Sequence, residues 1–99
     1  MNEIKIIDKN RVILTGVLVQ IGPGTTTQGF PFVNIIVKST GPKYVDEIPC
    51  VVYGATAERL VGSTIVGDLV TVYGRVRVKK KIDGKTFLSV VVTSIKKSI

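Results

Sequence analysis

The stretch VGDLVTVYGRVRVKKKIDGK, residues 66–85, changes along its length from a regular strand pattern to a run of positive charge. Between residues 70 and 79, apolar and polar side chains alternate. A period of two is typical of a β-strand with one buried and one solvent-facing side. The valines share one face, interrupted by Gly74, and we expect them to be buried: Val70, Val72, Val76 and Val78.

The opposite face of this strand presents a ring followed by cations: Thr71, Tyr73, Arg75, Arg77 and Lys79. Two further lysines lead into a turn signal at Asp83 and Gly84, and residues 86–95 form another β-rich run. Two strands joined by such a turn make a hairpin. A strand face that offers a ring together with cations suits a flexible polyanion with exposed bases.

The whole chain is basic, with 14 Lys and Arg against 7 Asp and Glu and a formal charge of +7. A dense basic patch is the electrostatic footprint of a polyphosphate partner. The alternative interpretation is a solvated surface that keeps a small domain soluble. Six of the cations lie close together in the sequence: Arg75, Arg77, Lys79, Lys80, Lys81 and Lys85.

The composition predicts a single β-rich domain over residues 1–99. Hydrophobic residues make up 44% of the 99 positions, and most of them are Val and Ile, which pack well on a pleated surface. Cys50 is the one cysteine and lies in an apolar run, so we expect a buried, inert thiol. The sequence shows no signal-peptide core and no apolar run of membrane-spanning length, which predicts a cytoplasmic location without membrane association.

Three β-strands are predicted before the hairpin, over residues 11–21, 30–38 and 44–53. Gly16 allows a sharp bend or a bulge in the first strand, and residues 22–29 are expected to be a loop. Both faces of the second strand are partly apolar, so its core face stays open. Pro49 in the third strand favours an edge position or a strand start. Residues 3–8 alternate weakly and could add a short edge strand.

A short helix is expected over residues 55–61, between the third and fourth strands, and Gly62 is expected to end it. Three strands, one helix and two strands follow the order of the OB-fold. This all-β fold is a small five-stranded Greek-key barrel that binds oligonucleotides and oligosaccharides. An SH3-like barrel is the alternative on strand number, but it usually lacks a helix at this point.

Residue types used in catalysis are scarce in this sequence. There is no histidine, and one cysteine cannot build a thiolate metal site. The adjacent acids Asp46 and Glu47 lie in a strand, where their side chains point to opposite faces. The segment GPGTTTQG, residues 22–29, lacks the Gly-Lys-Ser/Thr of a phosphate-binding loop and precedes a strand. The sequence therefore predicts a binding protein that is not an enzyme and has no metal or cofactor.

Four segments together resemble the bacterial single-stranded DNA-binding protein (SSB) family, including the related primosomal replication protein N. The similarity covers roughly residues 10–95. Each motif is weak alone, but their order and spacing are fairly specific. The segments are NRVILTG (residues 10–16), FVNIIVKS (32–39), IPCVVYGATAERL (48–60) and GDLVTVYGRVRV (67–78).

The resemblance implies a non-catalytic protein that binds single-stranded DNA in replication and repair. It implies a nucleoid-associated homo-oligomer, a dimer or a tetramer, assembled through the first strand, with replication proteins as further partners. The family's aromatic at the end of the third strand is kept as Tyr53, but other family aromatics fall at Glu47, Thr40 and Lys81. We therefore expect binding to depend more on charge than on stacking. The acidic tail typical of the family is not present after the barrel, which predicts a tailless member.

The candidate nucleic-acid-binding residues combine the family positions with the basic hairpin. Phe32 and Phe87 are expected in the core. Two other functions remain open: an adaptor that binds a protein partner of the replisome or primosome type, favoured by Glu47 and the missing tryptophans, and a binder of single-stranded RNA. The candidates are Lys38, Tyr53, Tyr73, Arg75, Arg77, Lys79, Lys80, Lys81 and Lys85.

Overall fold

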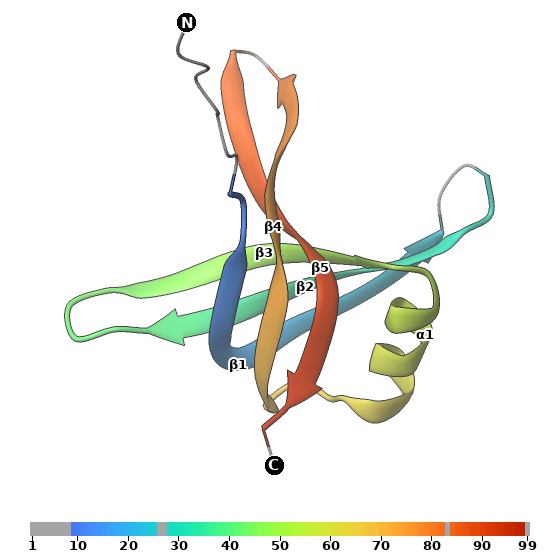
Figure 1. Ribbon diagram of the computed structural model, residues 1–99, viewed down its shortest axis with the longest axis horizontal. Helices are drawn as coiled ribbons and strands as arrows, with labels where there is room; N and C mark the ends of the chain where they lie inside the picture. Colours follow the sequence, from blue (N-terminus) through green and yellow to red (C-terminus); the bar gives the residue numbers. More distant parts are fainter. Residues whose placement is uncertain (1–8, 26–27, 83, 99) are drawn as a thin grey trace, which may run out of the picture.

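A computed structural model describes residues 9–25, 28–82 and 84–98 of the chain. Within these residues five strands close into one barrel, and a single helix lies between the third and fourth strands (Figure 1). The predicted all-β OB-fold is therefore confirmed. The edge strand expected over residues 3–8 lies outside the described residues. The elements are β1 (Val12–Thr25), β2 (Pro31–Thr40), β3 (Val45–Tyr53), α1 (Gly54–Ser63), β4 (Leu69–Ile82) and β5 (Lys85–Lys97).

The strands follow the order β1-β2-β3-β5-β4, and β4 returns to β1 to close the barrel. The β3–β5 contact is parallel and the other pairs are antiparallel. β1 closes the barrel by pairing with β4 over residues 12–17 and with β2 from residue 17 onward. Gly16 lies at this change of partner, where a Cβ atom would overlap the backbone oxygen of Lys38. A glycine is needed there because the two backbones approach so closely.

The core is built from the inward faces of all five strands and is closed at one end by Ala57 and Leu60 of α1. The structure settles the core face of β2, which is the valine and isoleucine side rather than the phenylalanine side. Cys50 is buried as expected, and its burial raises the pKa of the thiol to about 11. The strand residues of the core are Leu14, Leu18, Val33, Ile35, Val37, Cys50, Val52, Val70, Val72, Val90 and Val92.

Two predicted boundaries are corrected by strand pairing and capping. β1 continues through residues 22–25, which pair with residues 31–34 of β2, so the first half of the expected loop is strand. The helix runs past Gly62 to Ser63 and ends where the backbone N–H of Thr64 donates to the Leu60 carbonyl. The interpretation of Pro49 is confirmed, because β3 contacts β5 only over residues 50–52 and Pro49 lies outside that contact.

The outer part of the β4–β5 hairpin projects from the barrel (Figure 1), and we call residues 75–82 and 85–89 the arm. Val76 is 36% exposed and Val78 is 61% exposed, so the prediction that both are buried is wrong. β1 pairs with β4 only as far as Gly74. Asn10 extends the contact by two residues along β4, since its side chain accepts from the Val76 N–H at 2.8 Å and donates to the Val76 carbonyl at 2.7 Å. Beyond that point the barrel no longer covers the valine face.

None of the helical residues that the structure describes forms a segment long and apolar enough to cross a membrane.

Candidate nucleic-acid interface

A row of outward-facing residues crosses the sheet at the base of the arm. Strand register aligns Asn34 of β2 with Val51 of β3, then Val91 of β5 and Arg75 of β4. Val51 is only 5% exposed yet lies outside the barrel core cluster, so neighbouring side chains of this outer surface cover it. In this row the apolar side chains of Val51 and Val91 lie between the amide of Asn34 and the guanidinium of Arg75.

Two aromatic rings lie directly beside this row. Phe32 and Tyr53 are opposite each other on β2 and β3, with ring centroids 6.4 Å apart and planes tilted by 48°. Tyr53 is half exposed. The Phe32 ring lies over Gly24 of β1, where a Cβ would come within 2.7 Å of the ring. A half-exposed ring of this kind can stack a nucleic-acid base.

The expectation that Phe32 belongs to the core is wrong. The alternation of β2 sends Val33 inward, and Phe32 therefore faces outward beside Tyr53. The missed signal is the cross-strand position: Phe32 pairs with Tyr53 on one side and with Gly24 on the other. The side chain of Phe87 lies outside the described part of the structure.

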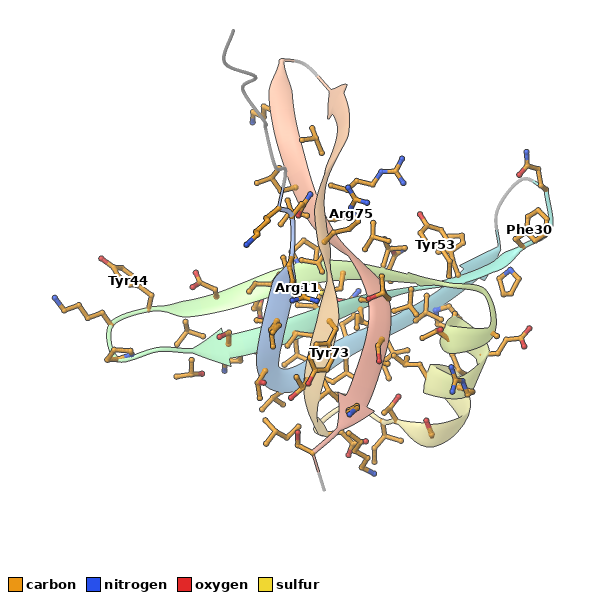
Figure 2. All side chains as sticks on the ribbon, viewed as in Figure 1. Arg11, Phe30, Tyr44, Tyr53, Tyr73 and Arg75 are labelled. Atoms are coloured by element: carbon orange, nitrogen blue, oxygen red, sulfur yellow. The ribbon has the colours of Figure 1, made fainter. Side chains whose placement is uncertain are left out.

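The two arginines of β4 are exposed, and with Val91 they line a hollow. Figure 2 shows Arg75 at the base of the arm. Arg77 is opposite Ser89, one step outward from the Arg75–Val91 pair. Neither guanidinium makes an ion pair within the described residues, where the pair observed is Lys97 with Asp68. No carboxylate of the described residues therefore neutralises their positive charge.

The lysines continue along the arm toward its tip. Lys79 pairs with Phe87, and Lys85 is exposed and pairs with Ile82. Lys80 and Lys81 fall in an irregularity of the β4–β5 register. The side chains of residues 79–81 lie outside the described part of the structure, so contacts from these lysines remain a prediction.

Lys38 lies on the same outer surface but away from the arginines. It is exposed and opposite Glu47, six residues along β2 from Phe32. At about 3.3 Å per residue this separates it from the aromatic pair by roughly 20 Å. The structure therefore brings Tyr53, Arg75 and Arg77 together, and leaves Lys38 at the far end of the sheet beside an acid.

Tyr73 lies on the β1–β4 side of the barrel. It pairs with Ile13 and lines a hollow together with Arg11 and Thr93. Arg11 is not among the binding residues predicted from the sequence. Because Val12 pairs with Gly74, Arg11 reaches the same level of the sheet as Arg75. The signal that could have found it is its position just before the first strand, combined with that register.

No known protein-family model matches the sequence, and no curated protein matches it. The structure is similar to the crystal structure of the SSB domain of a Synechococcus protein, with a TM-score of 0.75. The two sequences are 20% identical, and the similarity covers 92% of this chain and 98% of that one. The comparison identifies the class of fold, an OB-fold barrel like that of an SSB domain.

Proposed function

We propose that this chain is a non-catalytic single-stranded DNA-binding protein of the SSB type, used in DNA replication and repair. The observation that carries the proposal is the grouping of the Phe32–Tyr53 pair with Arg75 and Arg77 around Val91 on one outer surface. The family motifs in the sequence and the similarity of the fold to an SSB domain support it.

The division of labour follows from the chemistry of these groups. Arginine pairs bidentately with phosphate and also stacks on bases, so Arg75 and Arg77 are suited to the backbone of a passing strand. Tyr53 supplies a ring on which a base can stack, worth ~1–3 kcal/mol. The lysines from residue 79 to 85 extend the positive charge toward the tip of the arm. A duplex does not expose the faces of its bases, so we expect a preference for single strands.

Binding of this kind depends strongly on salt. Each phosphate neutralised on a single strand releases counterions and contributes about −0.7 to the slope of log affinity against log salt concentration. With few described rings and many cations, we expect most of the affinity to come from this term. We also expect little preference among bases, because neither phosphate contacts nor ring stacking reads a base edge.

The direct test is fluorescence anisotropy with a labelled oligo-dT of about 30 nucleotides, a length above the ~4–16 nucleotides covered by one OB-fold. We expect tight binding at low salt, weaker binding near physiological salt, and no displacement by duplex DNA. A matched oligo-U competitor distinguishes DNA from RNA as the preferred ligand. Failure to bind oligo-dT even at low salt would sink the proposal.

We further propose that the protein forms a homo-oligomer through the β1–β4 side of the barrel. Exposed apolar residues face outward there, and Val17 pairs with Leu69 while Ile13 pairs with Tyr73. Ile13 is 64% exposed, and contiguous apolar surface of this kind favours contact with another protein surface. Sedimentation equilibrium measures the mass directly, and a monomer at high protein concentration would contradict this part of the proposal.

A second candidate function is an adaptor that binds a protein partner through the arm. The specific observation is the apolar face of the arm, where Val76, Val78 and Leu88 are all exposed. This function is favoured over DNA binding if the folded protein binds a replication protein but not oligo-dT. The substitution Leu88→Ser should then abolish binding to the replication protein.

A further inference from the structure

A further polar hollow is lined by residues of α1 and by the last residues of β5. These two elements lie away from the arm (Figure 1). The volume of the hollow is about 270 Å³ and its lining includes Thr56, Arg59, Ser94 and Lys97 around the apolar Leu60 and Ile95. None of the described residues that line it carries a carboxylate. The volume is below the ~300–1,000 Å³ of small-molecule pockets but is ample for one phosphate group.

The hydroxyl groups of this hollow divide into two sets. One set donates its hydrogens to backbone carbonyls and comprises Ser63, Thr64 and Thr93. Thr56 and Ser94 make no side-chain hydrogen bond among the described residues, so their O–H groups are free to donate. Two free hydroxyl donors beside two cations match the acceptor oxygens of a phosphate.

The charge of the hollow is positive even after its ion pair is counted. Lys97 Nζ lies 3.4 Å from the carboxylate of Asp68, and the Lys97 side chain remains 45% exposed. Arg59 is exposed and has no ion pair within the described residues. Arg59, Lys97 and Asp68 together carry a net charge of +1, and within the described part of the chain the Arg59 guanidinium has no carboxylate partner.

Two hollows that contain cations lie along β5. Val91 lines the hollow of Arg75 and Arg77. Thr93, two residues on, lines the hollow beside α1 that contains Arg59 and Lys97. A polyanion that lies along β5 therefore meets positive charge at the base of the arm and again beside the helix.

We propose that the hollow between α1 and β5 is an additional phosphate site, which holds a backbone phosphate of the same single strand that binds at the arm. Arg59 pairs with the phosphate oxygens, the hydroxyls of Thr56 and Ser94 donate to them, and Lys97 adds charge. The inference rests on the proposed function and adds a second segment to its binding path. From Val91 to Lys97 the path spans roughly 20 Å, six residues at about 3.3 Å each.

The test compares Arg59→Gln with the matched control Lys96→Gln. Both changes remove one positive charge. Lys96 pairs with Thr71 of β4 and does not line the hollow, whereas its neighbours Ile95 and Lys97 do. Each variant is titrated with labelled oligo-dT of about 30 nucleotides and of about 5 nucleotides, the short end of the ~4–16 nucleotides that one OB-fold covers.

We expect Arg59→Gln to reduce the salt slope for the long oligonucleotide by about 0.7, the value of one single-strand phosphate contact. The short oligonucleotide should bind wild type and variant alike, and Lys96→Gln should leave both slopes unchanged. The NMR chemical shifts of the backbone amides of Thr56 and Ser94 should change only when the long oligonucleotide is added.

Two outcomes overturn the inference in distinguishable ways. If the wild type binds the long oligonucleotide but Arg59→Gln behaves like Lys96→Gln, the additional site is absent and the proposed function stands. If the wild type binds neither oligonucleotide at low salt, the proposed function fails and the inference fails with it.

Discussion

The two halves of β4 have the same alternating sequence but opposite surroundings. Val70 and Val72 in the barrel are fully buried, whereas Val76 and Val78 in the arm are 36% and 61% exposed. The difference arises at Gly74, where pairing with β1 ends. A period of two therefore predicts which residues share a face, but a second layer of structure decides whether that face is buried. In this chain the covered half builds the fold and the uncovered half carries the charge proposed to bind DNA.

Gly74 marks the boundary between the two halves, and substitution there should have the largest effect on stability. A Cβ at Gly74 would overlap the backbone oxygen of Val91, which cannot move without disturbing β5. We expect Gly74→Ala to lower the free energy of unfolding by about 3 kcal/mol, the upper end of the usual cost of overpacking. Unfolding in urea measures this change in the free energy of unfolding.

The control for this prediction is Gly62→Ala in α1, where an added Cβ would have no neighbour within 4 Å. Replacing a helical glycine by alanine should stabilise the protein by about 0.5–1 kcal/mol. Equal effects of the two substitutions would show that the close approach at Gly74 does not limit the packing of the two strands.

The pH dependence of the unfolding free energy tests whether Cys50 is buried in the barrel. Burial raises the pKa of its thiol from 9.0 to about 11, so the unfolded chain ionises at lower pH than the folded one. This contribution to stability is fully present below pH 9 and is lost as the pH rises toward 11. The loss is at most about 2.7 kcal/mol, two pKa units at about 1.36 kcal/mol each.

The measurement is the free energy of unfolding from pH 8 to pH 11 for the wild type and Cys50→Ala. Subtracting the two curves removes the titration of lysines and tyrosines, which both proteins share. Parallel curves would mean that the Cys50 thiol is accessible to water in the folded barrel.

Truncating one valine in each half of β4 compares a buried site with an exposed one. Val72→Ala removes buried methyl groups and should cost about 2 kcal/mol of unfolding free energy. Val78→Ala removes the same groups from an exposed site and should cost less than about 0.5 kcal/mol. Similar costs, measured by urea unfolding under one set of conditions, would indicate that the arm is covered in solution, for example by another protein chain.

The affinity for oligo-dT tests whether the Tyr53 ring stacks a base. Loss of this ring should weaken oligo-dT binding by about tenfold, which is ~1.4 kcal/mol and falls within the range of one stacked base. The control is Tyr44→Ala, since Tyr44 is 74% exposed near the β2–β3 turn (Figure 2). If Tyr44→Ala weakens anisotropy-measured binding as much as Tyr53→Ala does, the proposed stacking position is wrong.

The sequence was sufficient to predict the strand order, the helix and the role of Pro49, because local periodicity and glycine or proline positions determine them. It could not predict that residues 22–25 continue β1, since their partners on β2 come from a separate part of the chain. The exposure of Val76 and Val78 was missed for the same reason, as it depends on where β1 ends.

The candidate site was predictable only in part. Arg75, Arg77 and Tyr53 were predicted from their alternation and their similarity to family positions, and the strand register places them on one outer surface. Phe32 and Arg11 were missed, because each joins the site through a cross-strand neighbour rather than through its own sequence pattern. A site formed between strands requires the register, which local sequence does not contain.

A salt titration measures whether the uncovered half of β4 binds the phosphates of a single strand. Affinity for oligo-dT is measured against salt concentration for the wild type and for Arg75→Gln with Arg77→Gln. We predict a slope reduced by about 1.4, two phosphate contacts at ~0.7 each, with an unchanged free energy of unfolding. An unchanged slope would contradict the account and would remove both arginines from the binding site.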